Sequence, residues 1–137
     1  MKISSLLSKV RALFSRKRSA AKAVGNAGEK LAERYLKSRG FKIIRRNYAA
    51  PMGEIDIIAQ DKETLVFVEV KSRTGGIEGA AEYAVNQKKR NRIAKTALYY
   101  LKEQKVREVD CRFDVVAINY SGREKPRIEL IKNAFQI

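Results

Sequence analysis

The sequence predicts a single α/β domain, with its elements in the order helix, three strands, helix, two strands. Its 137 residues are enough for one domain with a real core and hardly enough for two. Apolar residues make up 45% of the chain and charged residues 33%, a balance typical of globular rather than disordered proteins. Apolar side chains recur first at helical and then at alternating spacing, and this succession occurs twice along the chain.

The first part of the chain predicts a helix and a strand. Residues 29–39 carry an apolar face at helical spacing, and Gly40 is a good helix stop. We expect residues 25–28 to form a flexible lead into this helix. A first strand is predicted over residues 41–44, followed by a loop over residues 47–53 that contains a proline and a glycine.

The next two segments predict a β-hairpin. Residues 54–59 alternate polar and apolar side chains, as a strand with one solvated face does. Residues 64–71 form a second strand that is rich in β-branched side chains. Residues 61–63 between them are a short polar connection of the kind that joins hairpin strands.

The remaining elements are a long helix and two strands. A loop containing glycines is predicted over residues 73–79, and an amphipathic helix over residues 80–104. Strands are predicted over residues 111–120 and 127–131, with a turn between them. We find no internal repeat.

Composition removes several kinds of chemistry. The chain has no histidine, which excludes histidine triads, histidine general bases and histidine metal ligands. Its one cysteine, Cys111, excludes an internal disulfide framework and a multi-cysteine zinc site, and fits a reducing, cytoplasmic location. We expect Cys111 to be a small buried side chain. Catalysis must therefore rest on carboxylates, lysines, hydroxyls or that thiol.

The net charge of +15 favours an anionic partner, with nucleic acid or a membrane surface ahead of an acidic protein. Residues 1–22 hold seven cations and no anion, so removing them from the total leaves +8 on residues 23–137. We divide the chain there into a basic amphipathic extension, residues 1–22, and a globular domain, residues 23–137.

The extension carries an apolar stripe at helical spacing and admits three interpretations. It could lie on a membrane surface or nucleic acid through residues 1–18, serve as a transit peptide, or pack loosely on the domain. We favour the last. No stretch of the chain approaches the roughly 20 apolar residues of a transmembrane span.

The hairpin brings acidic side chains together. With an even-length loop centred between Lys62 and Glu63, Asp56 lies opposite Glu69 and Glu54 lies opposite Lys71. Opposed Cβ atoms are about 4.5–5.5 Å apart, and like charges there destabilise a sheet unless something offsets them. A divalent cation is a natural offset, because hard cations take carboxylate oxygens.

A lysine on the same face as these acids adds a second part of a hydrolytic site. Lys71 could orient or activate a water molecule at the metal, which suits metal-assisted hydrolysis of phosphodiesters. The alternative is a solvated sheet face on which Glu54 and Lys71 form a weak cross-strand ion pair. The apolar run around Glu69 favours the functional interpretation, because a buried carboxylate is costly.

These residues resemble a known signature. Gly53-Glu54-Ile55-Asp56 and Phe67-Val68-Glu69-Val70-Lys71-Ser72-Arg73 resemble the acid…(D/E)-x-K motif of the PD-(D/E)xK nuclease superfamily. More closely, residues 25–116 resemble the bacterial YraN family, also called UPF0102, which is similar to archaeal Holliday-junction resolvases. Further matches are Gly25-x-x-Gly28-Glu29, Tyr35-Leu36, Arg46-Asn47, Gly79, Val85, Lys89, Tyr100-Leu101 and Arg112-Phe113-Asp114.

The resemblance implies a restriction-endonuclease-like fold, in which a mixed central sheet is flanked by helices in the order α-β-β-β-α-β-β. It implies that Asp56 and Glu69 bind Mg²⁺ or Mn²⁺, with a backbone carbonyl near Val70, and that Lys71 positions the attacking water. Glu29 matches a glutamate that approaches the same metal; the alternative is an ordinary helix-surface acid. Glu54 matches the YraN pattern, as a support for the site or a partner of Lys71. Ile55 stands where the superfamily usually has proline.

Cations cluster on the second predicted helix and beside it. Their local charge suits phosphate contacts, which position a protein without reading sequence; the alternative is a solvated helix face. The predicted nucleic-acid contacts are Arg46, Arg73, Lys88, Lys89, Arg90, Arg92 and Lys95.

Three functions remain open at this level. The first is a metal-dependent endonuclease acting on DNA, with branched forms as candidate substrates. The second is a non-catalytic nucleic-acid-binding protein on a nuclease scaffold, and the third a membrane-surface protein tethered by the N-terminal extension. A homodimer would suit a two-fold symmetric junction, but the sequence shows no dimer interface.

Overall fold

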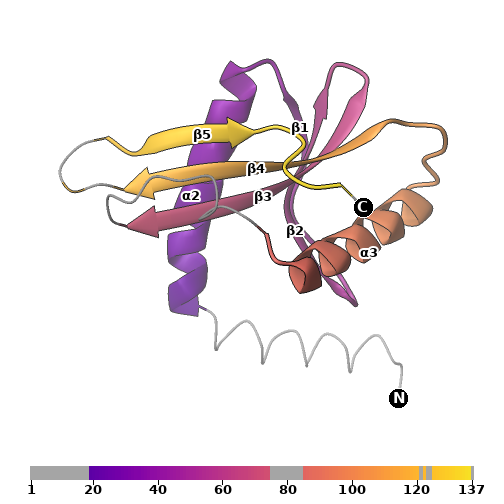
Figure 1. Ribbon diagram of the computed structural model, residues 1–137, viewed down its shortest axis with the longest axis horizontal. Helices are drawn as coiled ribbons and strands as arrows, with labels where there is room; N and C mark the ends of the chain where they lie inside the picture. Colours follow the sequence, from indigo (N-terminus) through magenta and orange to yellow (C-terminus); the bar gives the residue numbers. More distant parts are fainter. Residues whose placement is uncertain (1–18, 75–84, 121, 123–124, 137) are drawn as a thin grey trace.

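A five-stranded mixed sheet with a helix on each face forms the described part of the chain (Figure 1). The computed structural model describes residues 19–74, 85–120, 122 and 125–136, and side chains from Ala27 onward. The strands lie in sequence order, and only β3 and β4 run parallel. The elements are α2 Ser19–Ser38, β1 Lys42–Ala50, β2 Gly53–Asp61, β3 Thr64–Thr74, α3 Gln87–Glu103, β4 Cys111–Tyr120 and β5 Arg127–Ile131.

Alternate residues of β3 divide the core into two layers, because successive side chains of a strand point to opposite faces. Phe67 packs with Ile93 and Tyr100 of α3, in one buried cluster. Val66 and Val68 join a second cluster with Ala32 and Leu36 of α2. Helix α2 therefore covers one face of the sheet and α3 the other.

The predicted fold class and element order are confirmed. Strands β4 and β5 have the predicted bounds, and β2 and β3 contain the predicted hairpin strands. Asp61 pairs with Thr64 across the turn, so the even-length loop lies at Lys62 and Glu63 as expected.

Three predicted bounds are wrong. Helix α2 begins at Ser19, so the segment expected to be a flexible lead is helical. Gly28 allows this helix to pack closely on β3, because a Cβ atom there would come within 2.7 Å of Ser72 Oγ. Strand β1 continues through Asn47 to Ala50, so most of the predicted loop is strand and the turn is only Pro51 and Met52.

The third difference concerns α3. It begins at Gln87, and the side chain of Asn86 caps it by accepting a hydrogen bond from the backbone amide of Lys89 at 2.9 Å. An Asn cap satisfies an amide that has no partner within the helix. The predicted start at residue 80 and most of the predicted loop before it lie outside the described residues, as do residues 1–18 of the N-terminal extension.

Two smaller points follow from the described residues. Cys111 is exposed rather than buried, because it lies at the first position of β4. No helix in the described ranges has the length and apolar character needed to cross a bilayer.

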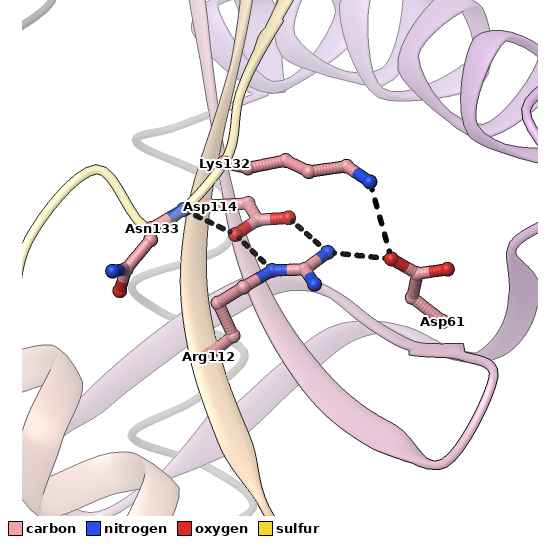
Figure 2. Close-up of polar contacts among 5 residues, drawn as sticks. All are labelled: Asp61, Arg112, Asp114, Lys132 and Asn133. Atoms are coloured by element: carbon pink, nitrogen blue, oxygen red, sulfur yellow. Dashed lines mark hydrogen bonds and ion pairs between the residues drawn. The ribbon is translucent and has the colours of Figure 1, made fainter.

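A buried ionic network ties the C-terminal segment to the sheet (Figure 2). Asp114 is fully buried and accepts two hydrogen bonds of 2.9 Å from Arg112 and one of 2.9 Å from the backbone amide of Asn133. Arg112 also donates to Asp61 at 2.9 Å, and Lys132 lies 3.4 Å from the same carboxylate. Arg112 and Asp114 of the matched Arg112-Phe113-Asp114 motif thus have a structural role on the α2 face, where Arg112 lies over the ring of Phe41.

Candidate metal and nucleic-acid site

Strands β2 and β3 diverge at the position of the predicted carboxylates. Their ladder runs from Asp61–Thr64 to Ile57–Val68, in the predicted register. Beyond this point β2 continues with β1 as far as Gly53, while β3 continues with β4 as far as Thr74. Figure 1 shows the β1–β2 hairpin reaching toward α3 while β3 runs on beside β4.

The divergence explains one wrong prediction. Glu54 pairs with Ala49 of β1, and Lys71 pairs with Ala117 of β4. The predicted opposition of Glu54 and Lys71 therefore does not occur, because the two strands have separated before reaching them.

Asp56 and Glu69 come next in this register, but they are not paired in the ladder, which ends at Ile57–Val68. Asp56 Oδ2 accepts a hydrogen bond of 2.8 Å from the backbone amide of Val70, which orients the carboxylate across the gap. Burial, followed by the charge of Glu69, raises the pKa of Asp56 to about 7, with a further contribution from Glu29. Near neutral pH the carboxyl group of Asp56 therefore loses its proton less readily than an ordinary aspartate.

Glu69 is the second carboxylate, and only 8% of it is exposed. It follows Val68 in β3 and alternates with it, so it points to the α3 face. There its Oε1 forms an ion pair with Nζ of Lys89, from the first turn of α3. Helix α3 therefore supplies a cation to the carboxylate pair.

An open cavity of about 520 Å³ lies between the β1–β2 turn and α3. Asp56, Glu69, Lys89 and Arg92 contribute to its lining, together with the exposed Glu54 at its rim. The close approach of α3 depends on Gly53, because a Cβ atom there would lie 3.0 Å from Arg92 Cγ and from Thr96 Oγ1. The cavity therefore joins both acids to two cations.

The predicted Glu29 and Lys71 approach the same site from α2 and β3. Glu29 is 9% exposed and close enough to raise the pKa of Asp56. Gly28, the residue before Glu29, lies close to Ser72, the residue after Lys71, so α2 packs against β3 beside the site. Burial, and then the charges of Lys89 and Arg73, lower the pKa of Lys71, so a proton is easier to remove from it than from an ordinary lysine.

The carboxylates fit a divalent cation, the group that the resemblance implies. Mg²⁺ commonly takes one or two protein carboxylates and completes its shell with water and substrate phosphate. A cation between Asp56 and Glu69 would remove the repulsion that raises the pKa of Asp56. In the described ranges no group of three or more His, Cys, Asp or Glu side chains is arranged to hold a metal. The fit thus rests on two carboxylates, and Glu29 stays a prediction as a third.

The predicted nucleic-acid contacts fall into separate groups. Lys88, Arg92 and Lys95 are exposed on α3, and Arg73 is exposed near the end of β3. Two others on α3 have internal contacts: Lys89 with Glu69, and Arg90 with the carbonyl of Val85 at 2.6 Å. Arg46 is not brought to this group, because it pairs with Glu33 of α2 at 2.9 Å.

Sequence reasoning missed that Lys89 contacts the acidic pair. A signal for it existed, because Lys89 precedes Ile93 and Ala97 at intervals of four and so begins the buried stripe of α3. A lysine on an apolar stripe indicates a specific partner, since its charge is costly to bury alone.

The fold and site together define a class of protein. It is an α/β protein with a restriction-endonuclease-like mixed sheet, in which two strands diverge beside a carboxylate pair. The chain belongs to the uncharacterised protein family UPF0102, whose profile matches residues 28–118. The predicted family is confirmed.

Relatives of known sequence cover most of the chain. It is 46% identical over 116 residues to the UPF0102 protein of Geobacter metallireducens, a match that covers 85% of this chain and 94% of that protein. It is 46% identical over 113 residues to that of Syntrophus aciditrophicus, covering 82% and 88%. A UPF0102 protein of Clostridium botulinum is 45% identical over 124 residues, covering 85% and 96%.

Proposed function

We propose that this chain is a Mg²⁺- or Mn²⁺-dependent endonuclease that hydrolyses phosphodiester bonds in DNA, with branched DNA as the substrate to test first. The proposal rests chiefly on Asp56 and Glu69, which lie together where β2 and β3 diverge and line a cavity to which Lys89 and Arg92 also contribute. Such a pair is costly to keep unless positive charge offsets it; Lys89 does so for Glu69, yet burial and Glu69 still raise the pKa of Asp56 to about 7. The proposed place of action is the cytoplasm.

Each residue of the site has a part in this proposal. Asp56 and Glu69 would hold the cation, and the amide of Val70 fixes the carboxylate of Asp56 by its 2.8 Å hydrogen bond. Lys71 orients the attacking water, and its lowered pKa makes its ammonium easier to deprotonate than that of an ordinary lysine. When bound, the metal ion supplies a more acidic water and stabilises charge that develops on the phosphate.

The exposed cations of α3 supply the DNA contacts in this proposal. Lys88, Arg92 and Lys95 lie at intervals of four and three, so they form one line along the helix. That line passes beside the cavity at Arg92, which also contributes to the cavity lining. A phosphate backbone following the line would therefore pass over the carboxylates, with no base contact needed.

Calorimetric titration of Mn²⁺ into the wild-type chain and Asp56→Asn tests the proposal. A cleavage assay on a four-way DNA junction and on linear duplex is run on the same samples. The expected result is Mn²⁺ binding and DNA products with the wild type, and neither with the variant. Cleavage that persists in Asp56→Asn would show that the assigned site is wrong. DNA binding without products at any metal concentration would favour the non-catalytic scaffold.

A further inference from the structure

The Lys89–Glu69 contact has no part in the proposed chemistry and needs an explanation of its own. Lys89 Nζ lies against Oε1 of a glutamate that is 8% exposed, at the cavity that Asp56 also lines. The backbone of Lys89 is held by the Asn86 cap at 2.9 Å. Its side chain is 43% exposed, so the ammonium can leave Glu69 for solvent without disturbing α3. The contact is therefore both specific and reversible.

We propose that Lys89 is a built-in competitor of the divalent cation: its ammonium occupies Glu69 in the metal-free chain and leaves when the cation binds. The inference rests on the proposed function, because it concerns the same carboxylates. It makes Lys89 a residue that sets the metal concentration at which the site fills, whereas the exposed cations of α3 serve DNA.

Charge balance at the site supports this role. Without a metal, the ammonium of Lys89 offsets one carboxylate of a pair that would otherwise repel. A cation held by Asp56 and Glu69 would repel an ammonium that stayed against Glu69. The two positive groups thus exclude one another on Glu69, which is the condition for competition.

A purely structural ion pair would behave differently. If the contact served only to join α3 to β3, its loss would destabilise the chain and leave metal affinity unchanged or lower. Competition makes the opposite prediction, because removal of the competitor frees Glu69. Metal affinity therefore separates the two roles.

Calorimetric titration of Mn²⁺ into the full chain and three variants tests the inference. Lys89→Met and Lys89→Gln remove the ammonium, and Lys88→Met is the matched control, with the same charge removed from the next position of α3. We expect both Lys89 variants to bind Mn²⁺ about tenfold more tightly than the wild type, within the usual range of coupling between two ligands. We expect Lys88→Met to change the affinity less than twofold, as an exposed charge screened by salt does.

A second readout follows the lysine itself. Quantitative acetylation with mass spectrometry compares the reaction rate of Lys89 with that of the exposed Lys88 and Lys95. We expect Lys89 to be protected without metal and its rate to rise severalfold with Mn²⁺, while the rates of the other two stay constant. A rate that is unchanged by saturating Mn²⁺ would show that the ammonium does not leave Glu69.

The outcomes distinguish this inference from the proposed function. Equal Mn²⁺ affinity in the wild type and both Lys89 variants, or an equal gain in Lys88→Met, overturns the competitor role and leaves the metal site standing. Absence of Mn²⁺ binding in every variant overturns the metal site and the competitor role together.

Discussion

The backbone amide of Val70 donates a 2.8 Å hydrogen bond to the carboxylate of Asp56, at the level where β2 and β3 separate. In a continuous hairpin, a strand amide on this side would bond to the partner strand's backbone. Here the side chain of Asp56 accepts the bond in place of the backbone. The same hydrogen bond therefore orients Asp56 and satisfies an amide that the separated strand β2 no longer pairs. The carboxylate is thereby fixed beside Glu69, which makes the site a property of the sheet rather than of a loop.

Substitution of Lys71 should separate metal binding from catalysis. We expect Lys71→Met to keep the Mn²⁺ affinity of the wild type, because the carboxylates remain, and to lower the cleavage rate about 10²–10⁴-fold through loss of a proton acceptor. Calorimetry and single-turnover cleavage measure the two effects. Lys62→Met, in the exposed turn of the same hairpin, is the control and should cleave normally. A Lys71→Met chain that cleaves at the wild-type rate would exclude Lys71 from the mechanism.

The pH dependence of stability should report on Asp56. Burial and the charge of Glu69 raise its pKa from 3.8 to about 7, so the folded chain binds the proton more tightly than the unfolded chain. The resulting stability is fully present below about pH 4 and is lost as the pH rises to about 7. We expect Asp56→Asn to show a smaller fall in Tm between pH 5 and pH 8 than the wild type.

Metal should reverse that loss. At pH 8 we expect Mn²⁺ to raise the Tm of the wild type, because it binds the folded chain and offsets the two carboxylates. The Tm of Asp56→Asn should not respond. If Tm without metal fell equally with pH in the wild type and in Asp56→Asn, the raised pKa of Asp56 would be contradicted.

Charge reversal on α3 should weaken DNA binding. We expect a triple variant with Glu at Lys88, Arg92 and Lys95 to bind DNA at least 10³-fold more weakly, and to reduce the slope of log K against log salt by about 3. Fluorescence anisotropy over a salt series measures both. The matched control reverses Lys30, Arg34 and Lys42, which are exposed on α2 and β1, with the same change in net charge. An equal loss in the two triple variants would mean that net charge, rather than α3, controls binding.

The network around Asp114 should affect stability and leave the metal site intact. Arg112→Met leaves a fully buried carboxylate without its main partner, and we expect it to lower the free energy of unfolding by about 3–5 kcal/mol. Lys132→Met removes an exposed partner of Asp61 and should cost less than about 1 kcal/mol. Urea unfolding measures both. A loss of Mn²⁺ affinity in folded Arg112→Met would contradict a purely structural role.

Local patterns in the sequence were sufficient for the element order, the bounds of β4 and β5, and the neighbourhood of Asp56 and Glu69. The physical reason is that a short even-length turn and the period of two together determine which residues face each other in a hairpin. The same patterns misplaced the start of α2 and the end of β1. The lead predicted at residues 25–28 lies inside α2, where Gly28 packs against Ser72, and residues 47–50 of the predicted loop belong to β1, which pairs with β2.

The resemblance implied Glu29, which approaches from a helix on one face of the sheet. Only the tertiary structure decided that Lys89 contacts Glu69 from a helix on the other face. It also decided that Glu54 and Lys71 do not pair, because β2 leaves β3 to follow β1. Contacts of this kind depend on which faces pack together and where strands part. These are properties of the whole sheet, whereas hairpin register is determined by a dozen neighbouring residues.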